Sequence, residues 1–151
     1  MIGPDLGRFL EEGLAIHVGT RDARLRPNGA RAAAATVAGG GRELIVYIPR
    51  VAAERLLPDL ESNGHAAVVF CRPVDERACQ VKGRFAGARA ATAGERALVA
   101  AQWDGFLVQL ERIGIPRPIS ERWVTWPAVA VTLTVTELFD QTPGPRAGTP
   151  L

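Results

Sequence analysis

Alternating apolar and polar residues predict that most of this chain forms β-strands. The clearest example is residues 129–136, where valine or leucine at every second position alternates with alanine or threonine. Shorter stretches with an alternating or continuous apolar pattern, separated by turn residues, predict the other strands. The six predicted strands cover residues 14–20, 30–37, 44–48, 66–71, 78–90 and 129–136.

Five of the eight residues of the second of these strands, residues 30–37, are alanine. Alanine favours helices, but this segment lies between Asn28-Gly29, a dipeptide typical of turns, and the three glycines 39–41. It is too short for a stable helix and has the length of a strand. A strand with almost no side chains allows close approach of a flat ligand.

Two other predicted strands differ from a simple alternating pattern, one by its continuous apolar run and one by its glycines. Residues 66–71 are a continuous apolar run, which predicts a strand buried on both faces. In residues 78–90, Gly83 and Gly87 are expected at bulges or bends, as small barrels require at their corners.

Three helices are expected between the strands. The first covers residues 5–13, and the second covers residues 51–60, where Pro58 is expected to bend or end it. Thr92 and Glu95 have the spacing of a capping box, which opens the longest helix. Its predicted apolar face consists of Val99, Trp103, Phe106, Leu107, Leu110 and Ile113.

The chain shows no repeat and no linker, so we expect one domain spanning residues 1–151. The segment 141–151 is rich in turn residues and is expected to be partly mobile. Short turns between most strands favour a mainly β fold: a six-stranded antiparallel barrel, closed or nearly closed, with flanking helices.

Composition narrows the possible partners. The 151 residues are 47% hydrophobic and 23% charged, as in soluble globular proteins, and no apolar run approaches the roughly 20 residues that span a bilayer. The N-terminus lacks the pattern of a signal peptide, so we expect a cytoplasmic location. A net charge of +2 is too small to indicate nucleic-acid binding. Every basic residue except Lys82 is arginine, so only its position can assign a function to any one of them.

No catalytic or metal-binding motif stands out. The hydrolase, P-loop and dinucleotide-binding signatures are absent, and the two cysteines, Cys71 and Cys79, do not form a metal-ligand pattern. His17 and His65 are far apart in the sequence, and we expect a structural role for both. Redox or other chemistry would therefore come from a bound cofactor.

Three segments between residues 14 and 90 share their order and spacing with a known protein family. They are Gly19-Thr20-Arg21-Asp22 with Pro27 before the alanine strand, the block 46–63 leading into an apolar strand, and Gln80-Val81-Lys82-Gly83. On these segments the chain resembles the pyridoxamine 5'-phosphate oxidase-like, FMN-binding split β-barrel proteins.

The resemblance implies FMN bound in a groove between the two subunits of a homodimer, together with a small-molecule substrate or electron donor. Small residues of the second strand would line the isoalloxazine ring, and Tyr47 and Ile48 would flank the ring or the ribityl chain. Arginines would hold the phosphate, because a guanidinium matches two phosphate oxygens, and Gln80 and Lys82 would approach from the partner subunit. The residues implied are Arg31, Ala32, Ala33, Ala34, Tyr47, Ile48, Arg50, Arg55, Gln80 and Lys82.

Each of these assignments has a structural alternative. The alanine strand is also consistent with a closely packed barrel wall, and Arg55 with a solvated helix residue paired with an acid. Tyr47, taken alone, is typical of a core residue.

The expected function is that of an FMN-dependent oxidoreductase whose substrate the sequence does not name. A non-catalytic flavin-binding or flavin-buffering protein stays open, because no acid–base residue stands out near the implied groove. A relative that binds a deazaflavin or haem also stays open, with His17 or His65 as a haem ligand. The chain lacks the C-terminal histidine of the vitamin B6 oxidases and has Glu54 at a position that is often basic, so we do not expect vitamin B6 oxidation.

Overall fold

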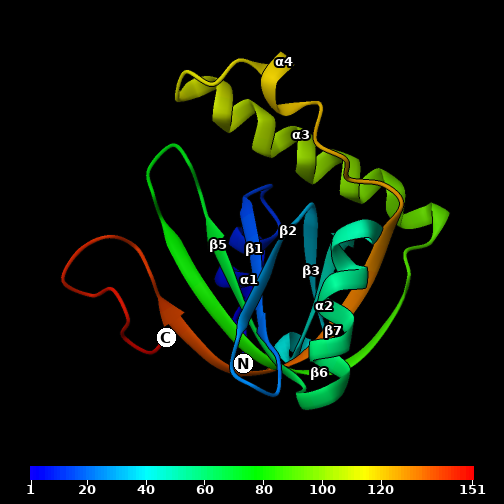
Figure 1. Cartoon of the computed structure of the whole chain (residues 1–151). Coiled ribbons are helices and arrows are strands. Elements are labelled where there is room, and N and C mark those ends of the chain that lie inside the picture. The colour runs from blue at the N-terminus through cyan, green and yellow to red at the C-terminus, as the bar shows by residue number, and fades with distance from the viewer.

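Seven antiparallel strands form one sheet that curls into a half-barrel (Figure 1). The computed structural model describes residues 1–151. The order of strands in the sheet is β2-β1-β5-β6-β7-β4-β3. The strands are β1 (Ala15–Arg21), β2 (Pro27–Ala32), β3 (Ala34–Ala38), β4 (Glu43–Pro49), β5 (His65–Cys71), β6 (Ala78–Ala90) and β7 (Ala128–Asp140).

The count of six strands was wrong because the predicted alanine strand is two strands. β2 pairs with β1 and β3 pairs with β4, at opposite ends of the sheet order. Ala33 lies between them, and its backbone N–H donates to the carbonyl oxygen of Tyr47 at 2.8 Å. The chain therefore changes partner at Ala33 and brings the two ends of the sheet together. A change of partner inside a run of alanines leaves no mark on the hydrophobic pattern.

The turn before β2 also differs from the prediction. Asn28 and Gly29 lie inside β2, paired with Thr20 and Gly19. The turn is instead formed by residues 22–26, where Asp22 Oδ1 accepts hydrogen bonds from the backbone N–H groups of Arg24 and Arg26. An aspartate that bonds the backbone two residues ahead stabilises a turn without the help of glycine.

Four α-helices and two single 3₁₀ turns flank the sheet. α3 and α4 lie beyond one end of the barrel (Figure 1), and Pro58 lies inside α2, which continues to Asn63. Of the two alternatives for Pro58, that it bends the helix or ends it, the second is therefore wrong; α2 ends at Gly64, which has a left-handed conformation. The bounds are α1 (Pro4–Leu10), η1 (Gly39–Gly41), α2 (Arg50–Asn63), η2 (Ala93–Glu95), α3 (Arg96–Arg112) and α4 (Arg117–Ser120).

The expectations for the capping box and for the two glycines of β6 are confirmed, whereas one residue of the predicted apolar face of α3 is exposed. The capping box of Thr92 and Glu95 is confirmed, and the pairing of β6 with β7 shifts register next to Gly83 and Gly87. Ile113 is 47% exposed and does not join the buried face of α3.

The interpretation of residues 66–71 as buried on both faces was wrong. Val68 and Phe70 of β5 are fully buried, whereas Val69 between them is only half-buried. The outer face of β5 is therefore left partly open to solvent by this chain.

The core has two parts. Twenty-two buried residues fill the barrel, and ten others pack between α3 and the strands β3, β4 and β7. Ala32 and Ala35 belong to the first part, and Ala33 and Ala34 belong to the second. Small side chains on β3 thus allow α3 to pack closely against the barrel.

The C-terminal segment folds back along the end of β7. The backbone N–H groups of Gly148 and Leu151 donate to the carbonyl oxygens of Asp140 and Leu138, and the Arg146 guanidinium donates to the Asp140 carboxylate at 2.8 Å. None of the helices combines the length and the apolar character needed to cross a membrane.

Candidate functional site

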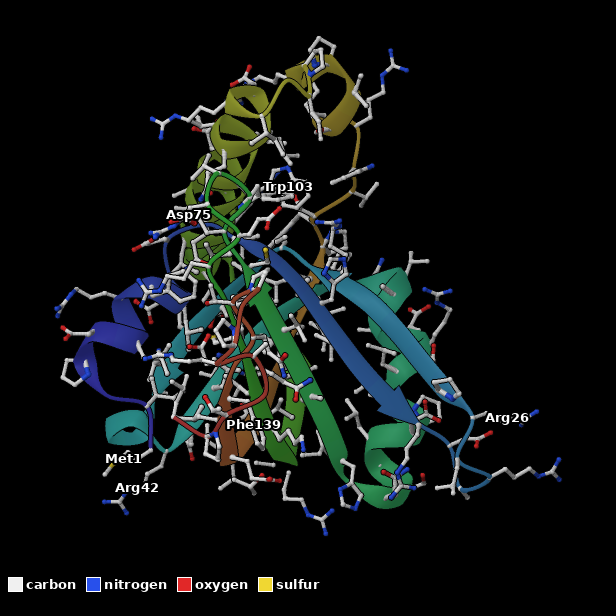
Figure 2. All side chains as sticks on the ribbon, turned by 90° about the vertical axis from the view of Figure 1, so that its left-hand side faces the viewer. Met1, Arg26, Arg42, Asp75, Trp103 and Phe139 are labelled. Carbon is white, nitrogen blue, oxygen red and sulfur yellow. The ribbon has the colours of Figure 1, made fainter.

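Two adjoining hollows border β2, and we call them together the arginine groove. The first, of about 460 Å³, lies between β2, the start of α2 and the segment that follows α4. The second, of about 580 Å³, lies on the outer face of β1, β2, β5 and β6. Ala30, Arg31 and Arg55 line both hollows. Figure 2 views the molecule from the side of this sheet face, with Trp103 of α3 at one end and Arg26 of the β1–β2 turn at the other.

Arg31 is half-buried in the groove and lacks a complete set of partners. Its guanidinium lies 4.5 Å from the ring centroid of Trp123 and 5.3 Å from that of Phe106. Its Nη1 atom is buried and makes no hydrogen bond, and burial lowers the pKa of the side chain. An unsatisfied buried donor is costly, so Arg31 offers a hydrogen bond to an anion that enters the groove.

The position of Arg55 depends on the contacts that hold α2 against β2. Asn28 Nδ2 donates to the backbone oxygen of Arg55 at 2.8 Å and to the carboxylate of Asp59 at 3.2 Å. The same Asp59 oxygen accepts from the hydroxyl of Thr20 at 2.8 Å. These bonds place the exposed Arg55 side chain, which pairs with no acid, at the border of both hollows beside Arg31.

His17 lines the second hollow and lies opposite Arg31 in the pairing of β1 with β2. Partial burial, and secondarily the charge of Arg31, lower the pKa of His17 below its ordinary value. At neutral pH the imidazole is therefore uncharged. The sequence pattern favoured a structural role for His17, although the period of two in β1 sets it on the face opposite Ile16 and Val18.

Only part of the predicted alanine surface borders the groove. Ala32 and Ala33 line the first hollow. Ala34 is fully buried in the part of the core that contains Trp103 and Phe106. Because α3 covers it, Ala34 has no surface in the groove.

Tyr47, Ile48 and Arg50 line neither hollow. Ile48 is fully buried in the barrel core, and the hydroxyl of Tyr47 donates to Glu95 Oε1 at 2.9 Å. Arg50 is exposed at the start of α2, where its backbone N–H donates to the oxygen of Pro127. In this chain Tyr47 and Ile48 pack in the interior.

Gln80 and Lys82 follow one another on the outer face of β6. Gln80 lines the second hollow together with Val69. Lys82 lies outside the groove: its Nζ is 3.9 Å from the carboxylate of Glu137 and 4.5 Å from the ring centroid of Phe139.

Trp123 is a groove residue that the sequence pattern did not reveal. It lies in the irregular segment between α4 and β7, stacks on Phe106 with ring centroids 6.4 Å apart, and is 42% exposed. Nothing in the linear pattern links this segment to β2, which precedes it by some ninety residues. Its position depends on how α3 and α4 fold across the end of the barrel.

No protein-family model and no curated protein sequence matches the chain. Among solved structures it is similar to HupZ of Group A Streptococcus, with 17% identity and a TM-score of 0.58 over 98% of this chain and 100% of that one. It is also similar to an F420 reductase, with 16% identity and a TM-score of 0.57 over 87% and 93% of the two chains. A third is a putative pyridoxamine 5'-phosphate oxidase from Lactobacillus delbrueckii, with 13% identity and a TM-score of 0.55 over 91% and 92%.

At these identities the similarity concerns the fold. The chain has the split-barrel fold of the pyridoxamine 5'-phosphate oxidase-like proteins, as the resemblance in the sequence predicted.

Proposed function

We propose that this chain binds FMN in the arginine groove and acts as an FMN-dependent oxidoreductase. The observation that supports this most directly is the buried, unpartnered Nη1 of Arg31 beside the free guanidinium of Arg55. Two arginines that share one hollow and face no carboxylate suit a phosphate group.

The rest of the groove fits a flat ligand with a phosphate tail. Each hollow has a volume within the usual range of small-molecule sites. Gly29, Ala32 and Ala33 contribute little side-chain bulk. β2 is an end strand of the sheet, so one of its edges has backbone groups outside the ladder that are free to bond the polar edge of a ring. FMN would supply hydride or electron transfer.

Among the groove residues, His17 is the one whose side chain can accept a proton, because its lowered pKa leaves the imidazole uncharged at neutral pH. No aspartate or glutamate lines either hollow. This lack favours a second candidate function, a protein that binds flavin without turnover.

We also propose that the groove lies at the interface of a homodimer. The outer face of the sheet presents Ala67, Val69 and Phe139, all half-buried apolar residues, and no helix of the same chain crosses in front of β1 and β2 (Figure 2). A second copy placed on this face would remove that apolar surface from water and exclude solvent from the second hollow.

FMN binding to the purified chain tests the proposal. We expect about one FMN per subunit, measured by absorbance after reconstitution and by titration calorimetry. Arg31→Ala should raise the dissociation constant at least about tenfold, because charge-assisted hydrogen bonds to the phosphate are lost. Arg55→Ala should act in the same direction. The matched control is Arg112→Ala, an exposed arginine at the end of α3 far from the groove.

The outcomes separate the candidates. Failure to take up FMN, or uptake of only a deazaflavin or haem, would contradict the binding proposal. FMN binding combined with reduction by a nicotinamide or another donor supports an oxidoreductase. FMN binding without turnover with any donor or acceptor would leave only the flavin-binding function.

A further inference from the structure

A third hollow, of about 570 Å³, continues the outer sheet face beyond the arginine groove. It shares Gly19 and Ala67 with the second hollow, so small residues form a common floor. The charged residues around it come from four strands, and we call it the basic hollow. Those residues are Arg21 of β1, His65 of β5, Lys82 and Arg84 of β6, and Glu137 of β7.

Strand pairing brings Arg84 to the imidazole of His65. His65 lies opposite Arg84 in the pairing of β5 with β6, and Arg84 Nη1 lies 2.6 Å from His65 Nε2. A guanidinium only donates, so Nε2 is the acceptor and carries no proton. Lost hydration, then the charges of Arg84 and Arg21, lower the pKa of His65. His65 is therefore neutral at neutral pH and orients Arg84 without adding charge.

The positive charge of the basic hollow is poorly compensated. Its single carboxylate, Glu137, is nearest to Lys82, at 3.9 Å. No acid pairs with Arg21 or Arg84, and Arg84 makes one further contact, to the backbone oxygen of Asn63 at 3.4 Å. Elsewhere in the chain, Arg72, Arg89 and Arg117 are each matched with an acid. Because like charges repel, an anion bound between Arg21 and Arg84 would offset the charge of both guanidinium groups.

The basic hollow and the arginine groove lie at opposite ends of one surface. Arg31 faces His17, and Arg21 follows His17 by four residues along β1. At about 3.3 Å per residue the two ends are separated by about 13 Å. In Figure 2, Trp103, which lines the arginine groove, marks one end of this surface, and the turn with Arg26, which follows Arg21, marks the other. Two anionic groups can therefore lie on the same floor without sharing a site.

We infer that the basic hollow binds the phosphate or pyrophosphate group of a small phosphorylated molecule, held mainly by Arg21 and Arg84. Its role as the substrate or electron donor of the flavin rests on the proposed function, because the shared floor sets such a molecule next to the arginine groove. The binding of the anion itself does not depend on FMN. Lys82 contributes less, because Glu137 and the ring of Phe139 already engage it.

Titration calorimetry of the FMN-free protein with inorganic pyrophosphate at low salt tests this inference. We expect one site per subunit, with binding that weakens as salt is added. Arg84→Ala should raise the dissociation constant at least about tenfold, through loss of charge-assisted hydrogen bonds. Arg84→Lys should recover part of the affinity, since it keeps the charge and loses the fork of donors. Arg21→Ala is a second variant, and circular dichroism checks that each is folded.

Arg112→Ala serves as control because it removes an equal charge from a distant helix end. The inference is overturned by three results: no pyrophosphate binding, an equal loss in Arg112→Ala, or loss in Arg31→Ala with none in Arg84→Ala. The last result would place the anion in the arginine groove. Retention of FMN binding with no pyrophosphate site contradicts this inference alone, whereas a pyrophosphate site without FMN binding contradicts the proposed function alone.

Discussion

Glu95 accepts five hydrogen bonds: one from the hydroxyl of Tyr47, two from the guanidinium of Arg89, and two from the backbone and side chain of Thr92. These bonds, those of Arg89 first, hold the pKa of Glu95 well below its ordinary value. The sequence predicted the capping box with Thr92. The bond to Tyr47 was not predictable, because it depends on where β4 meets the start of α3.

Substituting Glu95→Gln tests this contact through the pH dependence of stability. A carboxylate whose pKa is depressed in the folded state stabilises the protein above its unfolded pKa, near 4.3, and that contribution is lost as the pH falls further. The wild-type free energy of unfolding should therefore decrease below about pH 4, and Glu95→Gln should make this decrease shallower. Denaturant unfolding at several pH values measures it.

The matched control is Glu121→Gln, because Glu121 is exposed and forms no ion pair. Glu121→Gln should leave the pH dependence unchanged. If the slope below pH 4 were the same in Glu95→Gln and in the wild type, the five bonds would not lower the pKa of Glu95.

Among the elements, α3 is held to the barrel by polar contacts as well as by its apolar face. The side chain of Gln102 accepts from the backbone N–H of Ala35 at 3.0 Å and donates to its carbonyl oxygen at 2.8 Å. Gln109 donates to the oxygen of Gly13, whose φ is +81° and where a Cβ would lie 2.3 Å from the oxygen of Gln102. Gly13 thus allows α3 to approach the chain before β1.

Replacing Gln102→Leu removes both bonds to Ala35 while nearly keeping the volume of the side chain. The buried N–H and C=O of this end strand then lack partners, which costs about 1–3 kcal/mol for each group. We expect a lower midpoint in denaturant unfolding with an unchanged slope. Arg112→Ala on the same helix should change the midpoint little. Equal midpoints for Gln102→Leu and the wild type would show that Gln102 does not secure β3.

At the scale of the whole molecule, the outer face of the sheet, which no helix of the same chain covers at β1 and β2, is the proposed homodimer interface. Val69 is half-buried in the middle of this face, and Val74 is exposed in the turn between β5 and β6. If the face is the homodimer interface, Val69→Lys should weaken dimerisation at least about tenfold, because a buried charge without a partner is costly. Sedimentation velocity over a range of concentrations measures this.

Val74→Lys introduces the same charge into the neighbouring turn and should leave the dimer intact. A wild-type protein that stays monomeric at all concentrations would contradict the homodimer proposal. The same dilution series shows whether FMN is released as the subunits separate, as a groove at the interface requires.

Several strands and the start of one helix could be predicted from the local sequence. Alternating or continuous apolar patterns located β1, β4, β5, β6 and β7, and the capping box located the start of the long helix, since these depend on neighbouring residues alone. The spacing of motifs pointed correctly to the split-barrel fold. The assignment of Arg31 and Arg55 to one site remains a prediction, although the structure sets both beside the same hollows.

Contacts between segments far apart in the chain determined the split of the alanine run and the positions of Tyr47 and Trp123. An alanine run has the same local preferences whether it forms one strand or two, so only closure of the barrel splits it at Ala33. Burial of Tyr47 and the stacking of Trp123 over Arg31 follow from how α3 crosses the end of the barrel. Local sequence fixes which backbone conformations are favourable, whereas the side chains that meet in a groove are chosen by packing between segments far apart in the chain.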